Sequence, residues 1–452
     1  MADKHAMNMC EGGLFGKIIL FALPLCGTFL LQLMFNAADL IVVGRFASHQ
    51  ALAAVGSTGS VLMLMLNLLF GISAGTSVLA ANFFGANDRQ SLCKTIHTSM
   101  LLSLGSGVVF GVIGFYVARF LLKLMATPDD VLDGATLYMQ IIFLGLPFRM
   151  ANVFGNSLLR SLGDTKRPLI YLVYAGLVNV ALNLLMVVKF HKAVEGVAWA
   201  TVVSELISAV LVWEALAHLD DDIALRFRKL ALHGKTMIKL LKIGIPAGIQ
   251  GSCYSLSNVV IQSTVNSFGS LAMAGNAATV SLEGIIYTGS GSFYHTALSF
   301  AGQNYGAKKY DRIVRSVVLC LMLSGLITTV IGWTFILFRQ QLLSIYVTDP
   351  EVLQYGYERM KVSFTLYAFM GFLDVLSGGL RGVGRSVINT AITLVCVCGL
   401  RLLWIFWILP KHRTFSFLFV SYPLSWGITA AIMGVYFYLV IRKIRKTAEG
   451  AK

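Results

Sequence analysis

Long apolar segments, separated by short polar ones, follow one another along almost the whole chain. Residues 169–188, for example, hold no charged side chain and reach the ~20 residues with which a helix crosses the apolar core of a bilayer. The pattern predicts an all-α membrane protein with twelve transmembrane helices, at residues 15–44, 51–80, 95–123, 134–159, 168–188, 194–217, 240–266, 271–300, 316–338, 357–380, 386–409 and 415–441.

The composition agrees with this pattern. Of the 452 residues, 57% are hydrophobic and only 13% are charged, whereas a soluble chain is about a quarter charged. Twelve helices of ~25 residues leave ~150 residues for all loops and tails. A soluble enzyme is therefore excluded, and we expect no catalytic domain outside the membrane.

The net charge of +15 comes mainly from one set of loops. Loops and tails on the side of the N-terminus carry 24 lysines and arginines, and the opposite loops carry 8. We expect the protein to cross the cell's plasma membrane many times, and by the positive-inside rule both termini are expected in the cytoplasm. The charge thus reflects orientation, and no nucleic-acid partner is expected.

The two halves of the chain repeat each other. Three segments in the first half recur with the same spacing in the second, since positions 82 and 303, 130 and 351, and 159 and 380 all differ by 221. Pro24 and Pro246 differ by 222. The longest polar stretch separates the copies, so we expect an N-terminal lobe at 1–217, a cytoplasmic linker at 218–239 and a C-terminal lobe at 240–452.

This repeat favours a transporter. Six predicted helices separate the copies, an even number, so both run the same way through the membrane. Such parallel repeats are related by a pseudo-two-fold axis along the membrane normal, with a binding site expected where they meet. Alternating access uses this symmetry, whereas a channel, receptor or membrane enzyme does not need it.

Several motifs add a family resemblance. They are the first-helix segment 31–46 (LQLMFNAADLIVVGRF), ALAAVG at 51–56, LRSLGDTKRP at 159–168, GQNYGA at 302–307 and LSGGLRG at 376–382. At these residues the chain resembles the multidrug and toxic compound extrusion (MATE) transporters, in the branch named after a DNA-damage-inducible protein. The resemblance implies two six-helix lobes forming a V, and export of cationic or amphipathic compounds in exchange for protons or sodium ions.

Carboxylates inside predicted spans are the main candidates for function, because each costs ~3 kcal/mol or more to insert. Four stand out, and they predominate among the charges within the spans: Asp39, Glu205, Glu283 and Asp374.

Asp39 is the strongest candidate for coupling transport to an ion. Gln32, Asn36 and Asp39 share one helix face because they are spaced i, i+4 and i+7. Asn179 and Asn183 form an i, i+4 pair in the fifth span, and Thr201 lies on a polar face of the sixth. These groups are expected to converge, although a structural hydrogen bond for Asp39 and polar packing between helices for the two asparagines are the alternatives.

The family resemblance assigns roles to four of these residues. It implies that Asp39 is the protonation site and that Asn179, Asn183 and Thr201 complete a cation site. The family commonly has Asp where this chain has Asn183, and hard cations favour carboxylate oxygen. We therefore favour H⁺ over Na⁺ as the coupling ion, with Na⁺ at the same four residues as the alternative.

A substrate cavity is expected from further polar stripes. Glu283 and Tyr287 lie on one face of the eighth span, and Tyr367 and Asp374 on one face of the tenth, where acids and aromatic faces attract organic cations. Burial as partners of Arg149 or Arg401 is the alternative for Glu283 and Asp374, and a lysine or hydroxyl neighbour is the alternative for Glu205. The predicted cavity residues are Gln32, Asn36, Glu205, Glu283, Tyr287, Tyr367 and Asp374.

Pro24 lies in the middle of the first predicted helix, where a proline leaves a carbonyl unpaired and favours a kink. The resemblance implies that this helix changes between straight and bent, whereas a static kink is the alternative. Pro24 is therefore a candidate conformational residue.

The sequence leaves two rival functions open. A flippase for lipid-linked sugar precursors, from the same superfamily, is expected to have extra spans and a more basic cavity. A membrane enzyme would need a Gly-x-Ser-x-Gly, paired-Asp or His-Glu-x-x-His constellation, and the sequence holds none. We expect a monomeric secondary transporter for small molecules, with no cofactor besides the coupling ion, no catalytic residues, no metal centre, and no cysteine placed for an extracellular disulfide.

Overall fold

The structure, a computed structural model, describes residues 7–125 and 127–449, which contain helices and no β-strand. The predicted cytoplasmic termini include residues 1–6 and 450–452, which lie outside the described residues. Contacts divide the chain into two compact units. Unit 1 comprises Met1–Asn8 and Gly27–Gly248, and unit 2 comprises Met9–Cys26 and Ile249–Lys452.

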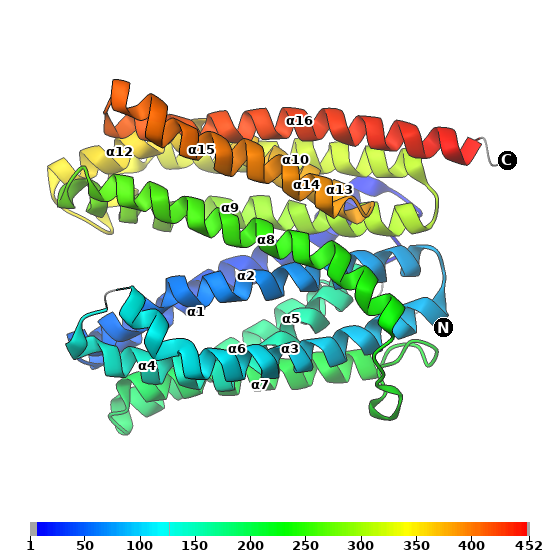
Figure 1. The fold of residues 1–452 in the computed structure, drawn as a ribbon, viewed down its shortest axis with the longest axis horizontal. Helices are drawn as coiled ribbons and strands as arrows, with labels where there is room; N and C mark the ends of the chain where they lie inside the picture. The colour runs from blue at the N-terminus through cyan, green and yellow to red at the C-terminus, as the bar shows by residue number, and fades with distance from the viewer. Residues whose placement is uncertain (1–6, 126, 450–452) are drawn as a thin grey trace. The chain divides into compact units, whose positions relative to one another are not determined.

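Unit 1 is a bundle of long helices, of which α2 and α3 pack side by side (Figure 1). Its polar linker is also part of the bundle, because Ile223 and Leu225 are buried in the unit's core. The elements of unit 1 are the later part of α1 (Leu14–Phe46), α2 (His49–Gly85), α3 (Arg89–Leu124), α4 (Asp129–Leu144), α5 (Leu146–Ser161), α6 (Lys166–Leu184), the π-helix η1 (Leu185–Lys189), α7 (Ala193–Ala217), the 3-10 turn η2 (Phe227–Lys229) and the first part of α8 (Gly234–Asn266).

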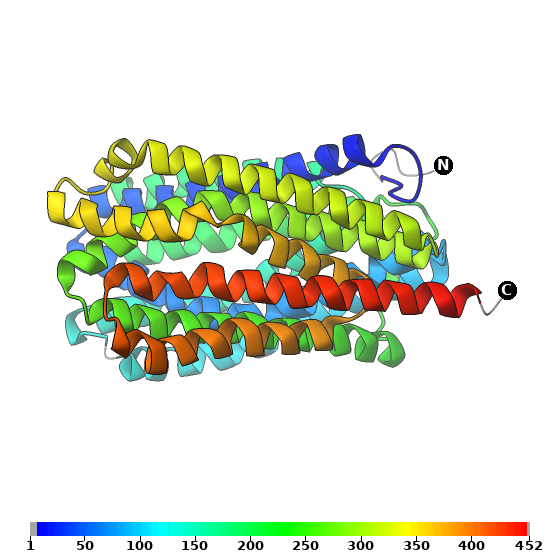
Figure 2. The same cartoon turned by 90° about the horizontal axis from the view of Figure 1, so that it is seen from above.

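Unit 2 repeats this order of elements with a more broken penultimate span. Figure 2 shows its last helix, in red, running the length of the unit. Its elements are the early part of α1, the later part of α8, α9 (Ser270–Gly306), α10 (Tyr310–Leu337), α11 (Arg339–Ser344), α12 (Pro350–Thr365), α13 (Ala368–Gly382), α14 (Ser386–Thr393), η3 (Leu394–Gly399), α15 (Leu400–Leu403), η4 (Trp404–Ile408), η5 (Leu409–Lys411) and α16 (Phe415–Glu449).

The chain passes from one unit to the other inside two helices. Within α1 the passage lies between Cys26 and Gly27, two residues after Pro24. Within α8 it lies between Gly248 and Ile249, two residues after Pro246. Both prolines lie inside a helix of 33 residues, so neither ends its helix.

Each of the twelve predicted spans falls on one helix or on a run of consecutive helices. Among the described residues, eight helical segments are long and apolar enough to cross a membrane, and two bent pairs raise this to ten. The helices α8 and α9, at 33 and 37 residues, are long enough but more polar. Many polar residues of α9, including Ser292, Gln303 and Asn304, are buried within unit 2, where they do not meet lipid.

Two spans that the sequence predicts as continuous are broken in the structure. Residues 134–159 form α4 and α5, which meet at Gly145 with a bend of 51°. Pro147 is the second residue of α5 and has no N–H to continue the hydrogen bonds of α4. Residues 357–380 form α12 and α13, bent by 48°. The break occurs at the same place in both copies and therefore belongs to the repeated design.

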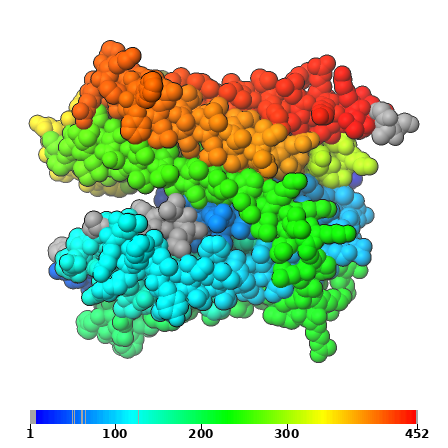
Figure 3. All heavy atoms as spheres, in the orientation of Figure 1, coloured from blue at the N-terminus to red at the C-terminus, as the bar shows by residue number. Residues whose placement is uncertain are grey.

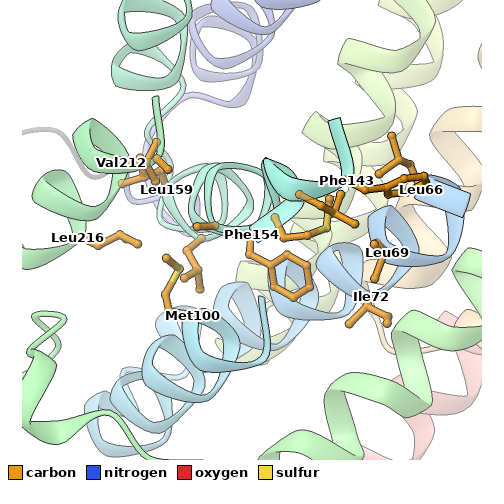
Figure 4. Close-up of a cluster of buried hydrophobic side chains, with 14 of the residues drawn as sticks. Leu66, Leu69, Ile72, Met100, Phe143, Phe154, Leu159, Val212 and Leu216 are labelled. Carbon is orange, nitrogen blue, oxygen red and sulfur yellow. The ribbon is translucent and has the colours of Figure 1, made fainter. Parts of the chain in front are cut away.

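The core of unit 1 shows how closely the helices approach. Phe143 and Phe154 are buried in one apolar cluster with side chains from neighbouring helices (Figure 4). A Cβ added at Gly111 in α3 would lie 2.7 Å from the Phe143 carbonyl oxygen. In unit 2, a Cβ at Gly332 would lie 2.7 Å from the Phe364 carbonyl oxygen. Both residues of this second pair stand 221 positions after the first, so the same close contact is built twice.

Candidate functional site

A carboxylate and two amides meet inside unit 1. The α6 residue Asn183 is fully buried, and its Nδ2 donates to Asp39 Oδ1 of α1 at 2.6 Å and to Asn179 Oδ1 at 3.2 Å. The Asn183 Oδ1 atom is buried and has no hydrogen-bond partner among the described residues. Asp39 forms no ion pair with any described residue, so its charge is balanced by neutral groups alone.

No hydrogen bond among the described residues joins Asp39 to the other residues predicted near it. Thr201 donates its hydroxyl to Val197 O, one turn earlier in its own helix, at 2.9 Å. Gln32 and Asn36 are exposed on the surface of unit 1. Tyr138 of α4 was not among the predicted residues, and it lies close enough to interact electrostatically with Asp39.

Glu205 is part of a second polar network in unit 1, between α5 and α7. Asn152 donates to Glu205 Oε2 at 2.8 Å, and Arg149 Nε lies 4.0 Å from Glu205 Oε1. Ser208 and Asn156 both donate to Asn152 Oδ1, at 3.0 and 2.7 Å. Glu205 is therefore held by an arginine and an amide, where the sequence suggested lysine or hydroxyl neighbours.

Glu283 forms a buried salt bridge in unit 2. Its Oε2 lies 2.5 Å from Nη2 of Arg359, whose side chain is 4% exposed. Arg359 also donates to the backbone and side-chain oxygens of Asn276, at 3.0 and 2.5 Å, and its guanidinium lies over the Phe419 ring. The partner of Glu283 is thus Arg359 and neither Arg149 nor Arg401.

The remaining predicted cavity residues of unit 2 differ in exposure. Asp374 of α13 accepts a hydrogen bond of 2.5 Å from the buried Ser290 of α9 and forms no ion pair among the described residues. Tyr287 is 49% exposed. Tyr367 is 2% exposed and packs edge-on against Trp426, so its ring belongs to the core of unit 2.

The environment of Arg401 in unit 2 differs from the one expected, in which an acid was its partner. It is 2% exposed, and its guanidinium carbon lies 4.0 Å from the centre of the Tyr422 ring and 5.9 Å from that of Trp426. Its hydrogen bonds to Ser425 Oγ and Asn258 Oδ1 are long, at 3.3 and 3.4 Å. It forms no ion pair with the described residues.

Acids therefore do not predominate inside the two units. Arg149 and Arg401 entered the sequence-based expectations only as partners of acids, although the cost of an arginine inside a membrane is a functional signal of the same kind. Applied to arginine, this criterion finds four residues within the predicted spans or at their ends: Arg149, Arg359, Arg381 and Arg401.

No group of three or more His, Cys, Asp or Glu side chains that could hold a metal ion occurs within residues 7–125 and 127–449. All seven cysteines are free thiols. A carboxylate such as that of Asp39 can bind and release a proton or a small cation. The other networks can hold charged groups in a low-dielectric interior.

Comparison with known proteins identifies the family. The MatE family profile matches residues 24–185 and again residues 246–407, more than half of the chain, and both bounds of the second match lie 222 positions after those of the first. This confirms the internal repeat.

Relatives and solved structures agree. The chain is 27% identical over 434 residues to "Probable multidrug resistance protein YoeA" of Bacillus subtilis, covering 94% of this chain and 93% of that protein. It is 24% identical over 338 residues to "DNA damage-inducible protein F" of Escherichia coli, covering 74% and 73%, which agrees with the predicted branch. A solved outward-facing MATE family multidrug resistance transporter matches with a TM-score of 0.90 at 18% identity, covering 99% of this chain and 100% of that one. The chain belongs to the multidrug and toxic compound extrusion (MATE) family of membrane transporters.

Proposed function

We propose that the protein is an antiporter that exports organic cations and amphipathic compounds by alternating access, with H⁺ as the coupling ion at Asp39. The observation that carries this proposal is the environment of Asp39. Its carboxylate accepts a hydrogen bond from the Asn183 amide at 2.6 Å inside an apolar helix and has no basic partner among the described residues. An intramembrane carboxylate of this kind costs free energy and is retained for a role.

The geometry of the amides favours a proton over sodium. The Asn183 Nδ2 group donates to both Asp39 Oδ1 and Asn179 Oδ1, so N–H bonds occupy the place between these oxygens that a cation would take. A protonated carboxyl becomes a hydrogen-bond donor, and the Asn183 Oδ1 beside it is an acceptor that no described residue occupies. Protonation of Asp39 would therefore remove a partly buried charge and reverse the direction of one hydrogen bond.

Proton binding drives transport only if it favours one conformation over the other. In our proposal H⁺ binds Asp39 from the outer side, repacks α1, in which Pro24 is the conformational residue, and lowers the affinity for the exported compound. The exposed side chains of Gln32 and Asn36 in unit 1, and of Tyr287 in unit 2, are the proposed substrate contacts. We further propose a monomer in the plasma membrane, and the charge bias of the loops supports cytoplasmic termini for it.

Proteoliposomes test the coupling directly. Efflux of the fluorescent cation ethidium would be measured under an imposed pH gradient and, separately, under an imposed sodium gradient. We expect efflux driven by the pH gradient in the wild type and its loss in Asp39→Asn. The control is Asp133→Asn, which neutralises an exposed carboxylate. Efflux that responds to sodium alone, or that survives in Asp39→Asn, contradicts the proposal.

One observation favours a second candidate, the flipping of a lipid-linked sugar precursor. Arg401 is a buried cation without a carboxylate partner among the described residues, and such a group suits an anionic substrate. A lipid-flipping assay in the same proteoliposomes, run beside ethidium efflux, separates the two. Flipping without ethidium efflux would favour this candidate.

A further inference from the structure

The linker of unit 1 forms one wall of a cavity that the transport proposal does not use. The cavity has a volume of about 430 Å³, within the ~300–1,000 Å³ of small-molecule sites. Its walls are the first turns of α3 and the linker that follows α7 (Figure 1). In Figure 3 the green atoms of the linker lie on the surface of unit 1, beside the blue and cyan atoms of α3.

Positive charge predominates in this cavity. Its lining includes Arg89 and Lys94 from α3 and Lys229 from the linker, against the single carboxylate of Asp222. Arg89 is partly engaged, because its Nη1 lies 3.1 Å from Asp220. Lys94 and Lys229 form no ion pair with the described residues, so both ammonium groups are available to a ligand.

Hydrogen bonds hold the linker against α3. The buried His97 accepts at Nε2 from the backbone N–H of Arg226 at 3.2 Å, and its other ring nitrogen lies 2.9 Å from Cys93 O. The backbone N–H of His233 donates to the Thr98 hydroxyl at 3.2 Å. These hydrogen bonds therefore fix the two walls of the cavity relative to each other.

The repeat shows that the fold does not require all of this lining. Positions 221 residues after Arg89, Cys93 and His97 in α3 are Tyr310, Val314 and Val318 in α10, whereas the position after Lys94 is the basic Arg315. Because the second copy folds without the first three side chains, their presence in unit 1 calls for a separate explanation.

We propose that this cavity binds the phosphate group of a ligand, either a soluble phosphate compound or the headgroup of an anionic lipid. Arginine and lysine are the side chains that bind phosphate, the first through its planar fork and the second as a point charge. The site lies at the first turn of a helix that is apolar enough to cross a membrane, where anionic headgroups gather by attraction to basic residues.

Binding measurements on the full-length protein test the proposal. The protein in phosphatidylcholine nanodiscs would be titrated with inorganic phosphate by calorimetry, and phosphatidylglycerol bound to the detergent-solubilised protein would be counted by native mass spectrometry. We expect Lys94→Gln/Lys229→Gln to weaken binding at least tenfold in whichever arm the wild type binds. Asp222→Asn removes the one opposing charge and should strengthen binding several-fold.

The matched control is Arg228→Gln, which removes one positive charge beside Lys229 but outside the cavity lining, and it should stay within twofold of the wild type. Asp222→Asn is informative even if the double lysine variant does not fold. Binding in the phosphate arm identifies a soluble ligand, and binding in the lipid arm alone identifies a headgroup. The proposal is overturned if the wild type binds neither probe, or if Asp222→Asn and the lysine variant bind as Arg228→Gln does.

Discussion

The two halves of the chain put opposite charges into equivalent parts of one fold. In unit 1, Asn179 and Asn183 lie beside the Asp39 carboxylate. In unit 2, the corresponding penultimate span carries Arg401, whose guanidinium lies on the Tyr422 ring. The repeat preserves the lengths of some helices, such as the 37 residues of α2 and α9, and it preserves the helix break and the close glycine contact. The charged groups inside the two units differ. The fold and the ion chemistry are therefore separable, and we expect coupling in one half only.

Both centres lie next to irregular helix. The π-helix η1 begins two residues after Asn183, and η3 and η4 flank Arg401. Such π-turns widen a helix locally and are frequent at functional sites. Substitutions of the charged groups therefore test whether the two centres differ in function.

The largest expected effect separates Asp39 from Arg401. Asp39→Asn should reduce pH-gradient-driven efflux to the level of empty liposomes, because no group is left to carry the proton. Arg401→Asn replaces the guanidinium by an amide like those of Asn179 and Asn183, and it should keep the dependence on the gradient even if the rate falls. Loss of that dependence in Arg401→Asn, with its survival in Asp39→Asn, would reverse the comparison.

A second prediction concerns the ion pairs of the two units. Arg359→Met leaves Glu283 buried without its partner and should cost ~3–5 kcal/mol of stability, measured by unfolding in detergent. Arg149→Met should cost less, because Arg149 lies 4.0 Å from Glu205, which also accepts from Asn152. As a control, Glu283→Gln/Arg359→Met should recover most of the loss. Equal losses of stability in Arg359→Met and Arg149→Met would contradict the prediction, because the two ion pairs would then contribute equally to folding.

Repeated backbone contacts should respond equally in both halves. Gly111→Ala and Gly332→Ala each force a Cβ toward a carbonyl oxygen 2.7 Å away, and overpacking of this kind costs ~1–3 kcal/mol. The losses, measured by thermal unfolding, should agree within experimental error. Gly59→Ala, where an added Cβ meets nothing within 4 Å, is the control. A loss of stability in only one of the two variants would show that the two halves are less symmetric than these contacts indicate.

The smallest expected loss of stability is that of Arg401→Lys. The charge is retained, but the planar group over Tyr422 is lost, and such a contact is worth ~1–2 kcal/mol when buried. A similar decrease is expected in Tyr422→Leu, with little further loss in the double variant, because both changes remove one interaction. Additive losses in a double-mutant cycle would show that the ring and the guanidinium act separately.

Much of the fold follows from local patterns. Every predicted span falls on helix because apolar segments of this length have one stable form in a bilayer. The breaks at Gly145 and near Leu366 were not predicted, since each lies inside a continuous apolar run. Pro147 was a signal for the first break, but the second has no proline beside it.

The contacts of the polar residues were likewise predictable from the sequence only in part. The i, i+4 spacing of Asn179 and Asn183 is a property of one helix, and the structure joins this pair to Asp39. The pairing of Glu283 with Arg359 joins residues 76 positions apart, which no spacing rule relates. Tyr367 has the spacing of a cavity residue yet lies in the core, because the chain breaks between α12 and α13 at this point and its ring packs against Trp426.

By itself, the sequence determined the membrane class, the twelve helices, the repeat and the resemblance that led to the family, because these depend on hydrophobicity and local order along the chain. Which charges inside the two units are balanced, and by which groups, depends on tertiary contacts. Glu205 and Glu283 face arginines, Asp39 faces amides, and Arg401 faces aromatic rings. The reason is physical: the free energy of a charge inside a membrane protein depends on groups within a few ångströms, which come from helices distant in the sequence.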